Sequence, residues 1–212
     1  DALLEFTYRG PAAVEAEPAL RALLAREMAA ERAEARRTAA EDRAGRDSGM
    51  PFLGHHYEKG WRVAGSSARL LSLAASTDTF TGGAHGNLAF SALLWDRAAD
   101  RPLAVAALLG AEAIAAMTPR FCAALDAERA ERAVEPVERD PDDPFGACPA
   151  LAEQVLAPAD EDGDGRFDTL EVLIPPYVAG SWAEGPYPVD LPFAAGDLAA
   201  LDAGLRDSFE AR

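Results

Sequence analysis

Residues 55–96 constrain the fold most, because apolar side chains recur there at every second position over three consecutive segments. The segments are HHYEKGWRV, ARLLSLAASTDTF and NLAFSALLWD. In the second of them, Leu71, Leu73 and Ala75 fall on one face, as expected of a strand. The connections are short, and the one between the last two segments is the glycine-rich TGGAHG. We therefore predict an antiparallel β-meander.

Helical segments flank this meander. An opening strand at residues 2–10 precedes a long Ala/Glu/Arg helix from about Pro18, a favourable first-turn residue, to about Ala44. Two helical pieces follow, and the second is expected to start at Pro119 with Thr118 as its cap. A final helix has an apolar face of Leu198, Leu201, Leu205 and Phe209. Because strands and helices are segregated and do not alternate as βαβ units, the predicted class is α+β. The predicted architecture is an antiparallel β-meander sheet packed by a long N-terminal helix, a central helical pair and a C-terminal helix.

The long helix has an apolar stripe only over its first half, formed by Leu20, Leu23, Leu24 and Met28. Beyond Met28 its apolar content is Ala alone, so we expect the second half to project into solvent, with a partner-contacting surface as the alternative. We also expect two subdomains packed as one unit: residues 1–65 as a strand-helix-strand subdomain and residues 66–212 as an α+β subdomain.

The charge of the chain restricts its partners. There are 36 acidic and 20 basic residues among 212, and the net charge is −16. Such a surface repels nucleic acid and anionic membrane and favours a basic partner. No apolar run approaches the ~20 residues that a membrane-spanning helix needs.

An acidic loop follows Pro158. Counting from Asp160, carboxylates occupy loop positions one, three, five, nine and twelve, and the residues are Asp160, Asp162, Asp164, Asp168 and Glu171. Gly165 stands at position six, and the Arg166 carbonyl would add a ligand at position seven. This is the spacing of an EF-hand calcium loop, so Ca²⁺ is the predicted cofactor. Prolines on both sides forbid the usual flanking helices, so the loop would join two strands or a short helix and a strand, and a solvated acidic turn is the alternative.

Cys122 and Cys148 are the only cysteines, and they frame a segment rich in Pro and Asp. A disulfide between them would stabilise the fold by about 3 kcal/mol through loop closure and would imply an oxidising compartment. Two buried free thiols are the alternative. The three histidines lack paired cysteines at zinc-ligand spacing.

His85 is the only candidate for catalysis, with Ser76, Asp78 and Ser91 nearby in the sequence. We expect instead a structural turn, because Gly82, Gly83 and Gly86 permit the backbone of a hairpin and His85 can bond carbonyls there. No known hydrolase, phosphate-loop or dinucleotide motif is present. The chain is therefore predicted not to be an enzyme, and a hydrolase using His85 is the alternative.

The Gly/Pro-rich loop from Pro176 to Pro188 contains Tyr177, Trp182, Glu184 and Tyr187. Aromatic residues on an exposed loop often anchor protein interfaces, so these four are the predicted partner-binding residues. In the alternative, the three aromatic side chains fold back into the core.

Two segments resemble one family. TFTGGAHGNLAFSALLWDRAADRPLAVAALL and LEVLIPPYVAGSWAEGPYPVDLPFAAGDLAAL are similar to the extracellular domain of RsiV, the anti-sigma-V factor, a module that also precedes the catalytic domain of peptidoglycan deacetylase C. The opening strand and helix suit the companion N-terminal domain found there. Gly82, Gly83, His85 and Gly86 match the family's turn motif, and Tyr177 and Gly185 match its closing string.

This resemblance implies an exported binding module, periplasmic or on the outer surface, with a lipid anchor on a removed N-terminal segment as an open possibility. Export favours the Cys122–Cys148 disulfide. The segment that binds the sigma factor and the deacetylase domain are both missing, so neither activity carries over. The resemblance implies binding, and possible inhibition, of lysozyme. Recognition of peptidoglycan or another envelope component is the alternative. The acidic loop and the cysteine pair depart from the family pattern.

Overall fold

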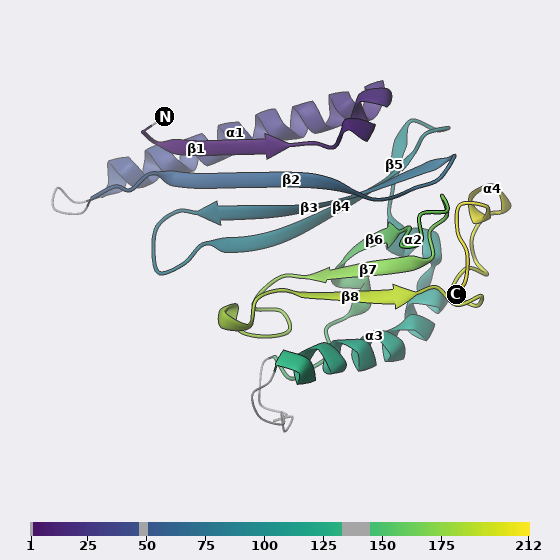
Figure 1. The fold of residues 1–212 in the computed structure, drawn as a ribbon. Helices are drawn as coiled ribbons and strands as arrows, with labels where there is room; N and C mark the ends of the chain where they lie inside the picture. Colours follow the sequence, from purple (N-terminus) through teal and green to yellow (C-terminus); the bar gives the residue numbers. More distant parts are fainter. Residues whose placement is uncertain (1, 47–50, 133–144) are drawn as a thin grey trace. The chain divides into compact units, whose positions relative to one another are not determined.

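The computed structural model describes residues 2–46, 51–132 and 145–212 (Figure 1). The chain divides into two compact units. Unit 1 comprises Asp1–Arg62 and Ala75–Ala89, and unit 2 comprises Val63–Ala74 and Phe90–Arg212. The boundary between the units passes through three strands. The predicted division into two subdomains at residue 65 stays a prediction. The α+β class is confirmed.

Five strands form one sheet in sequence order. They are β1 (Leu4–Arg9), β2 (His55–Ser66), β3 (Leu70–Phe80), β4 (Asn87–Asp96) and β5 (Arg101–Leu103). The strands predicted from the alternation are confirmed as β2, β3 and β4. β1 and β2 are parallel, with Leu4 opposite His55. Parallel neighbours need a crossover, and the long helix α1 (Pro18–Gly45) supplies it. The expectation that no βαβ unit is present was therefore wrong at this one place.

The second half of α1 does not project freely into solvent. Ala39 is fully buried, and Glu27 and Glu31 both bind Lys59 of β2. Tyr57 of β2 also donates to Glu31, at 2.6 Å. Charged and polar contacts hold the second half of α1 against β2. The periodicity of apolar residues in the sequence cannot predict such contacts.

In unit 2, three strands form a second, antiparallel sheet: β6 (Val155–Ala159), β7 (Thr169–Ile174) and β8 (Tyr187–Pro192). The helices α2 (Val105–Leu109) and α3 (Ala111–Arg132) belong to the same core. Fully buried side chains fill it, including Met117, Phe121, Leu125, Leu170, Val172, Ile174 and Tyr187. Burial of each such large apolar side chain stabilises the unit by about 1.5–3 kcal/mol.

The central helices divide at a different residue from the predicted one. α2 ends at Leu109, where Gly110 with a φ of 83° caps the helix, and α3 then continues through Pro119. Thr118 is not a cap, because its hydroxyl donates to the Ile114 carbonyl 2.8 Å away, inside the helix. Cys122 of α3 is bonded to Cys148, which confirms the predicted disulfide.

The C-terminal segment is mostly turns. Only α4 (Ala203–Arg206) is helical, although the predicted apolar residues Leu198, Leu201, Leu205 and Phe209 are all buried. The Asp197 carboxylate accepts from the Ala194 amide at 2.7 Å and also binds Arg120, which favours a turn over a continuous helix. Within the described residues, no helix combines the length and the apolarity that a membrane span requires.

Candidate functional site

The loop between β7 and β8 presents Tyr177 to solvent. Tyr177 is 52% exposed, and its φ of 70° lies in the left-handed region that side chains other than glycine rarely adopt. Its amide donates to the Gly180 carbonyl at 2.9 Å, which closes a tight turn. Backbone strain of this kind persists only where the surrounding structure enforces it, and it often marks a functional segment.

Two further aromatic rings adjoin Tyr177. The ring of Trp182 lies 6.3 Å from that of Tyr177. The ring of Phe145, in the segment that leads to Cys148, lies 6.5 Å from the Tyr177 ring. We call Phe145, Tyr177 and Trp182 the aromatic cluster. Phe145 and Trp182 are partly exposed. Aromatic rings that stay partly in water offer a rigid apolar surface with few rotatable bonds, a typical anchor for a protein partner.

Two arginines at the end of α3 hold this loop in place. Arg129 donates to the carbonyls of Ala179 and Ala147, both about 3 Å away, and so ties both segments that carry the cluster to one helix. Arg132 donates to the Pro186 carbonyl at 2.6 Å, and its guanidinium stacks on the Tyr187 ring. The disulfide anchors the Phe145 segment to the same helix.

Of the predicted partner-binding residues, Glu184 and Tyr187 have internal roles. Tyr187 is fully buried, and its hydroxyl donates to Glu184 at 2.6 Å. Glu184 also accepts from the Ser181 amide, completing a capping box at the short helix Trp182–Glu184. These hydrogen bonds lower the pKa of Glu184, while burial, followed by the bond to Glu184, raises the pKa of Tyr187 to about 12. Of the four predicted partner-binding residues, Tyr177 and Trp182 therefore remain as candidates, and their role in binding stays a prediction.

Glycine is required at one point of the loop. A Cβ on Gly180 would lie 2.6 Å from the Tyr187 ring and 2.8 Å from the Glu184 carboxylate. Any side chain there would displace the pair that shapes the turn, so the loop conformation depends on this residue.

The Gly82–Gly86 turn lies in unit 1. Gly82 and Gly83 have φ near 100°, and His85 is exposed, with Nδ1 bonded to the Gly86 carbonyl at 2.7 Å. A Cβ on Gly86 would lie 2.8 Å from the Thr79 carbonyl oxygen, so this position also requires glycine. The structural role expected for the turn stays a prediction.

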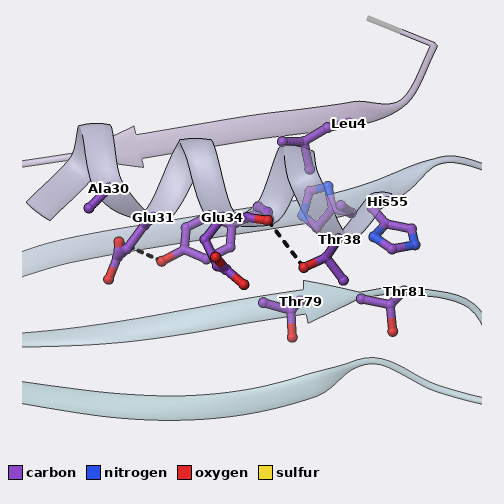
Figure 2. A pocket seen from close by; sticks show the side chains of 11 residues that line it. Leu4, Ala30, Glu31, Glu34, Thr38, His55, Thr79 and Thr81 are labelled. Carbon is purple, nitrogen blue, oxygen red and sulfur yellow. Dashed lines mark hydrogen bonds between the residues drawn. The ribbon is translucent and has the colours of Figure 1, made fainter. Parts of the chain in front are cut away.

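Unit 1 contains a groove beside α1 with a volume of about 580 Å³ (Figure 2). Its apolar lining includes Leu4, Ala30 and Ala35. Polar lining comes from His55 and Tyr57 of β2, from Thr79 and Thr81, and from Glu31, Glu34 and Thr38 of α1. An apolar pocket of this size with a few polar groups is typical of small-ligand sites. We call it the unit 1 groove.

A network of charged and aromatic side chains adjoins the groove. Lys59 is 4% exposed and lies 2.5 Å from Glu27 and 3.0 Å from Glu31, with its ammonium 5.0 Å from the Trp61 ring. Burial, together with these glutamates, raises the pKa of Tyr57 well above its usual range. At the other end of α1, His55 bonds Asp42, whose pKa is lowered by its hydrogen bonds to Arg46 and His55.

The acidic loop joins β6 and β7, two strands, as predicted. Asp160, Asp162 and Asp164 bring their carboxylates together, and Asp162, Asp168 and Glu210 form a second such group. Glu171 is in neither of the two groups that the described residues form, because it lies within β7 opposite Ala157 and Asp190. The Arg166 guanidinium binds the Phe209 carbonyl at 2.7 Å. The calcium site itself stays a prediction.

Sequence reasoning missed three contributors to these sites: Phe145, Arg129 and Glu210. Phe145 stands near the second cysteine, so the disulfide was the one available signal that it lies close to α3. Arg129 is one of several arginines in an Ala/Glu/Arg helix, and Glu210 reaches the acidic loop through a backbone bridge between Phe167 and Phe209. No local pattern distinguishes these residues.

Residues 1–88 match the protein-family model described as deacetylase PdaC, a stretch that includes nearly all of unit 1. This is the part for which the resemblance implied the companion domain of peptidoglycan deacetylase C. The RsiV-type identity of the rest stays a prediction. The comparison with curated proteins finds no match.

Two solved structures are similar at low identity. A member of the DUF3298 family from Bacteroides fragilis is 21% identical with a TM-score of 0.49, and the match covers 81% of this chain and 66% of that one. A DUF3298 family protein from Pseudomonas aeruginosa is 19% identical with a TM-score of 0.43, over 82% and 72%. The chain thus spans slightly less than two thirds of the Bacteroides protein, and likenesses this distant carry no functional argument.

Proposed function

We propose that this chain is a non-catalytic binding module of an exported protein and that it captures a basic protein of the lysozyme type. The aromatic cluster carries the proposal. It combines an exposed tyrosine on a strained backbone with two partly exposed rings, and the arginines of α3 fix both segments. A preformed apolar anchor of this kind needs little ordering when a partner binds.

Charge supplies the second support. The net charge of −16 attracts a strongly basic protein and speeds its association at low ionic strength. The disulfide suits an oxidising compartment, where secreted lysozymes occur. The resemblance to the RsiV-type domain points to the same ligand.

The test is the affinity for lysozyme, measured by calorimetry at several salt concentrations. We expect binding that weakens as salt rises and that falls by about 1–3 kcal/mol in Trp182→Ala. Leu53→Ala is the matched control, because Leu53 is 78% exposed and lies in unit 1. Cytochrome c, a basic protein without the lysozyme fold, separates specific capture from general attraction. Equal affinity for both proteins, or unchanged affinity in Trp182→Ala, would contradict the proposal.

A second candidate function is recognition of an envelope glycan, and the unit 1 groove favours it. Three threonine hydroxyls, a tyrosine and Glu34 line an apolar floor there, a mixture that suits the faces and hydroxyls of sugar rings. Ala35→Trp would fill the groove. If the groove binds glycan, this variant should no longer sediment with insoluble peptidoglycan, while its lysozyme binding should be unchanged. Sedimentation equal to that of the wild type would exclude the groove.

A further inference from the structure

Strand β1 lies in unit 1 and forms one edge of the five-stranded sheet (Figure 1). It pairs with β2, and within the described part of the chain no strand lies on its other side. The Leu3 carbonyl accepts from the His55 amide at 2.8 Å, which determines how the parallel pair is hydrogen-bonded. Backbone groups alternate in direction along a strand, so Thr7 directs its amide and carbonyl to β2, whereas Phe6 and Tyr8 direct theirs outward.

The outer edge of β1 lacks several devices that proteins use to prevent edge strands from pairing. Its sequence, LEFTYR, contains no proline and no lysine. It does contain two charged residues, Glu5 and Arg9, whose side chains are 78% and 67% exposed. Like charges directly opposite each other destabilise a strand pair. A strand that adds to this edge must therefore place an opposite charge beside each of them.

A second copy of β1 meets this requirement. We consider two copies that run antiparallel about a two-fold axis at Thr7. Glu5 then lies opposite Arg9 of the second copy, and Arg9 lies opposite its Glu5. Phe6 lies opposite Tyr8, and the two Thr7 side chains oppose each other. Opposite-charge, aromatic and threonine pairs are all favourable cross-strand neighbours, so the strand is complementary to itself.

The backbone of β1 favours the same register. In an antiparallel pair, residues that exchange two hydrogen bonds alternate with residues that exchange none. The axis at Thr7 opposes Phe6 and Tyr8, whose backbone groups point outward, and leaves Thr7 in the position without hydrogen bonds. An axis at Phe6 would also use the outward groups, but it would place Glu5 opposite Thr7 and leave the charges unmatched. Side chains and backbone thus select one register.

The two faces of β1 stay separate in such a dimer. The Tyr8 hydroxyl donates to Glu27 of α1 at 3.2 Å, so the side chains of Phe6 and Tyr8 lie on the face that α1 covers. Glu5 and Arg9 lie on the opposite face, because side chains alternate along a strand. A two-fold axis perpendicular to the sheet preserves both faces. The charged pairs therefore form on the face without α1.

The charge of the whole chain opposes self-association, since the net charge is −16. At physiological salt the Debye length is about 8 Å, so charges directly opposite each other outweigh those farther away. Arg9 also binds Glu58 of β2, and the several donors of a guanidinium can serve both this carboxylate and Glu5 of the second copy. The interface is small, so the dimer should dissociate on dilution.

We propose that the outer edge of β1 joins two copies of this chain in a symmetric antiparallel dimer centred on Thr7. Its hydrogen bonds extend the sheet of one copy into that of the other, as in strand addition. The proposal does not depend on the proposed function, because Glu5 and Arg9 neither belong to the aromatic cluster nor line the unit 1 groove.

The test is sedimentation velocity of the whole chain over a series of protein concentrations at physiological salt. We expect a monomer on dilution and a dimer at high concentration. Glu5→Arg and Arg9→Glu should each raise the dissociation constant roughly tenfold, because each places like charges opposite each other twice. An equimolar mixture of these two variants should dimerise about as well as the wild type, since every charge then meets its opposite.

Arg101→Glu is the matched control, because it makes the same charge change on β5, at the other edge of the sheet, and Arg101 is exposed. Hydrogen exchange locates the contact: the amides of Phe6 and Tyr8 should exchange more slowly at high protein concentration, and that of Thr7 should not change. Melting curves of dilute protein show whether each variant is folded.

A wild-type chain that stays monomeric at every concentration would overturn the proposal and leave this edge to a strand of another protein. A dimer that neither charge reversal weakens would place the contact elsewhere on the chain. A mixture of the two folded variants that stays monomeric would refute the register centred on Thr7. A loss in Arg101→Glu as large as that in Arg9→Glu would show an effect of net charge and not of β1.

Discussion

We predict that the ion pairs of Lys59 are the main interaction that stabilises the second half of α1 against the sheet. Its side chain is 5% exposed, whereas those of its partners Glu27 and Glu31 are 29% and 28% exposed. In Lys59→Met the two carboxylates would face each other without a cation. Removing one partner of a buried pair costs about 3–5 kcal/mol, and partial solvation of the glutamates reduces this to about 2–3 kcal/mol here.

The assay is urea unfolding followed by tryptophan fluorescence, since Trp61 lies beside Lys59 and its Nε1 donates to Tyr8 at 2.8 Å. A triple variant that adds Glu27→Gln and Glu31→Gln should recover to within about 1 kcal/mol of the wild type, because no unpaired charge is left. A glutamine at position 31 can still accept from the Tyr57 hydroxyl.

Arg9→Met is the control, because the Arg9–Glu58 pair is exposed and should contribute less than about 1 kcal/mol. If Lys59→Met is as stable as the wild type, the network does not hold the helix. If the triple variant is as unstable as the single one, the loss comes from the packing of the lysine stem and not from stranded charge.

Two further predictions concern pH. Hydrogen bonds from Arg69, and then from the Ala98 and Ala99 amides, hold the pKa of Asp96 below its usual value. A depressed folded pKa contributes stability that is present above the unfolded value near 3.8 and is lost as the pH falls through the folded value, so Asp96→Asn should flatten the acid limb of the unfolding free energy. Tyr187 has a pKa raised from 10.0 to about 12, so its contribution is complete below pH 10 and is lost between about pH 10 and 12. Tyr187→Phe should remove that alkaline loss. Chemical unfolding across the pH range measures the unfolding free energy for both variants. If Asp96→Asn has the same acid dependence as the wild type, or Tyr187→Phe the same alkaline dependence, the role given to that residue is wrong.

The sheet strands could be predicted because their information is local. The alternation of apolar residues across 70–80 and 87–96 can be read from adjacent positions alone, and these ranges are strands β3 and β4. The helix boundary at Gly110 was harder, since Thr118-Pro119 is a good start signal taken alone. Pro119 stays inside α3 because Met117 and Phe121, on either side of it, are both fully buried, and that packing outweighs the local preference.

The sites depended on contacts that are distant in the sequence. The docking of α1 needs the register of β2, which places Lys59 and Tyr57 opposite glutamates about 30 positions earlier. The spacing of the acidic loop is visible in the sequence, yet Glu171 lies within strand β7 and is in neither carboxylate group. The Phe167–Phe209 bridge places Glu210 in one of these groups. A linear motif can thus predict which carboxylates of a loop lie close together without identifying every residue that joins them.

Tyr177 allows fold and function to be separated. Holding a tyrosine at φ 70° costs about 1–2 kcal/mol, which asparagine largely avoids, while loss of the ring contacts with Trp182 and Phe145 costs about 0.5–1.5 kcal/mol. These effects nearly cancel, so Tyr177→Asn should unfold within about 1 kcal/mol of the wild type. Tyr177→Ala loses the ring contacts without relieving the backbone and should be the less stable variant. Both should bind a lysozyme-type partner at least tenfold more weakly. Equal stability of the two variants would mean that the backbone at residue 177 is not strained, and lysozyme binding equal to the wild type would mean that the strain serves something other than this contact.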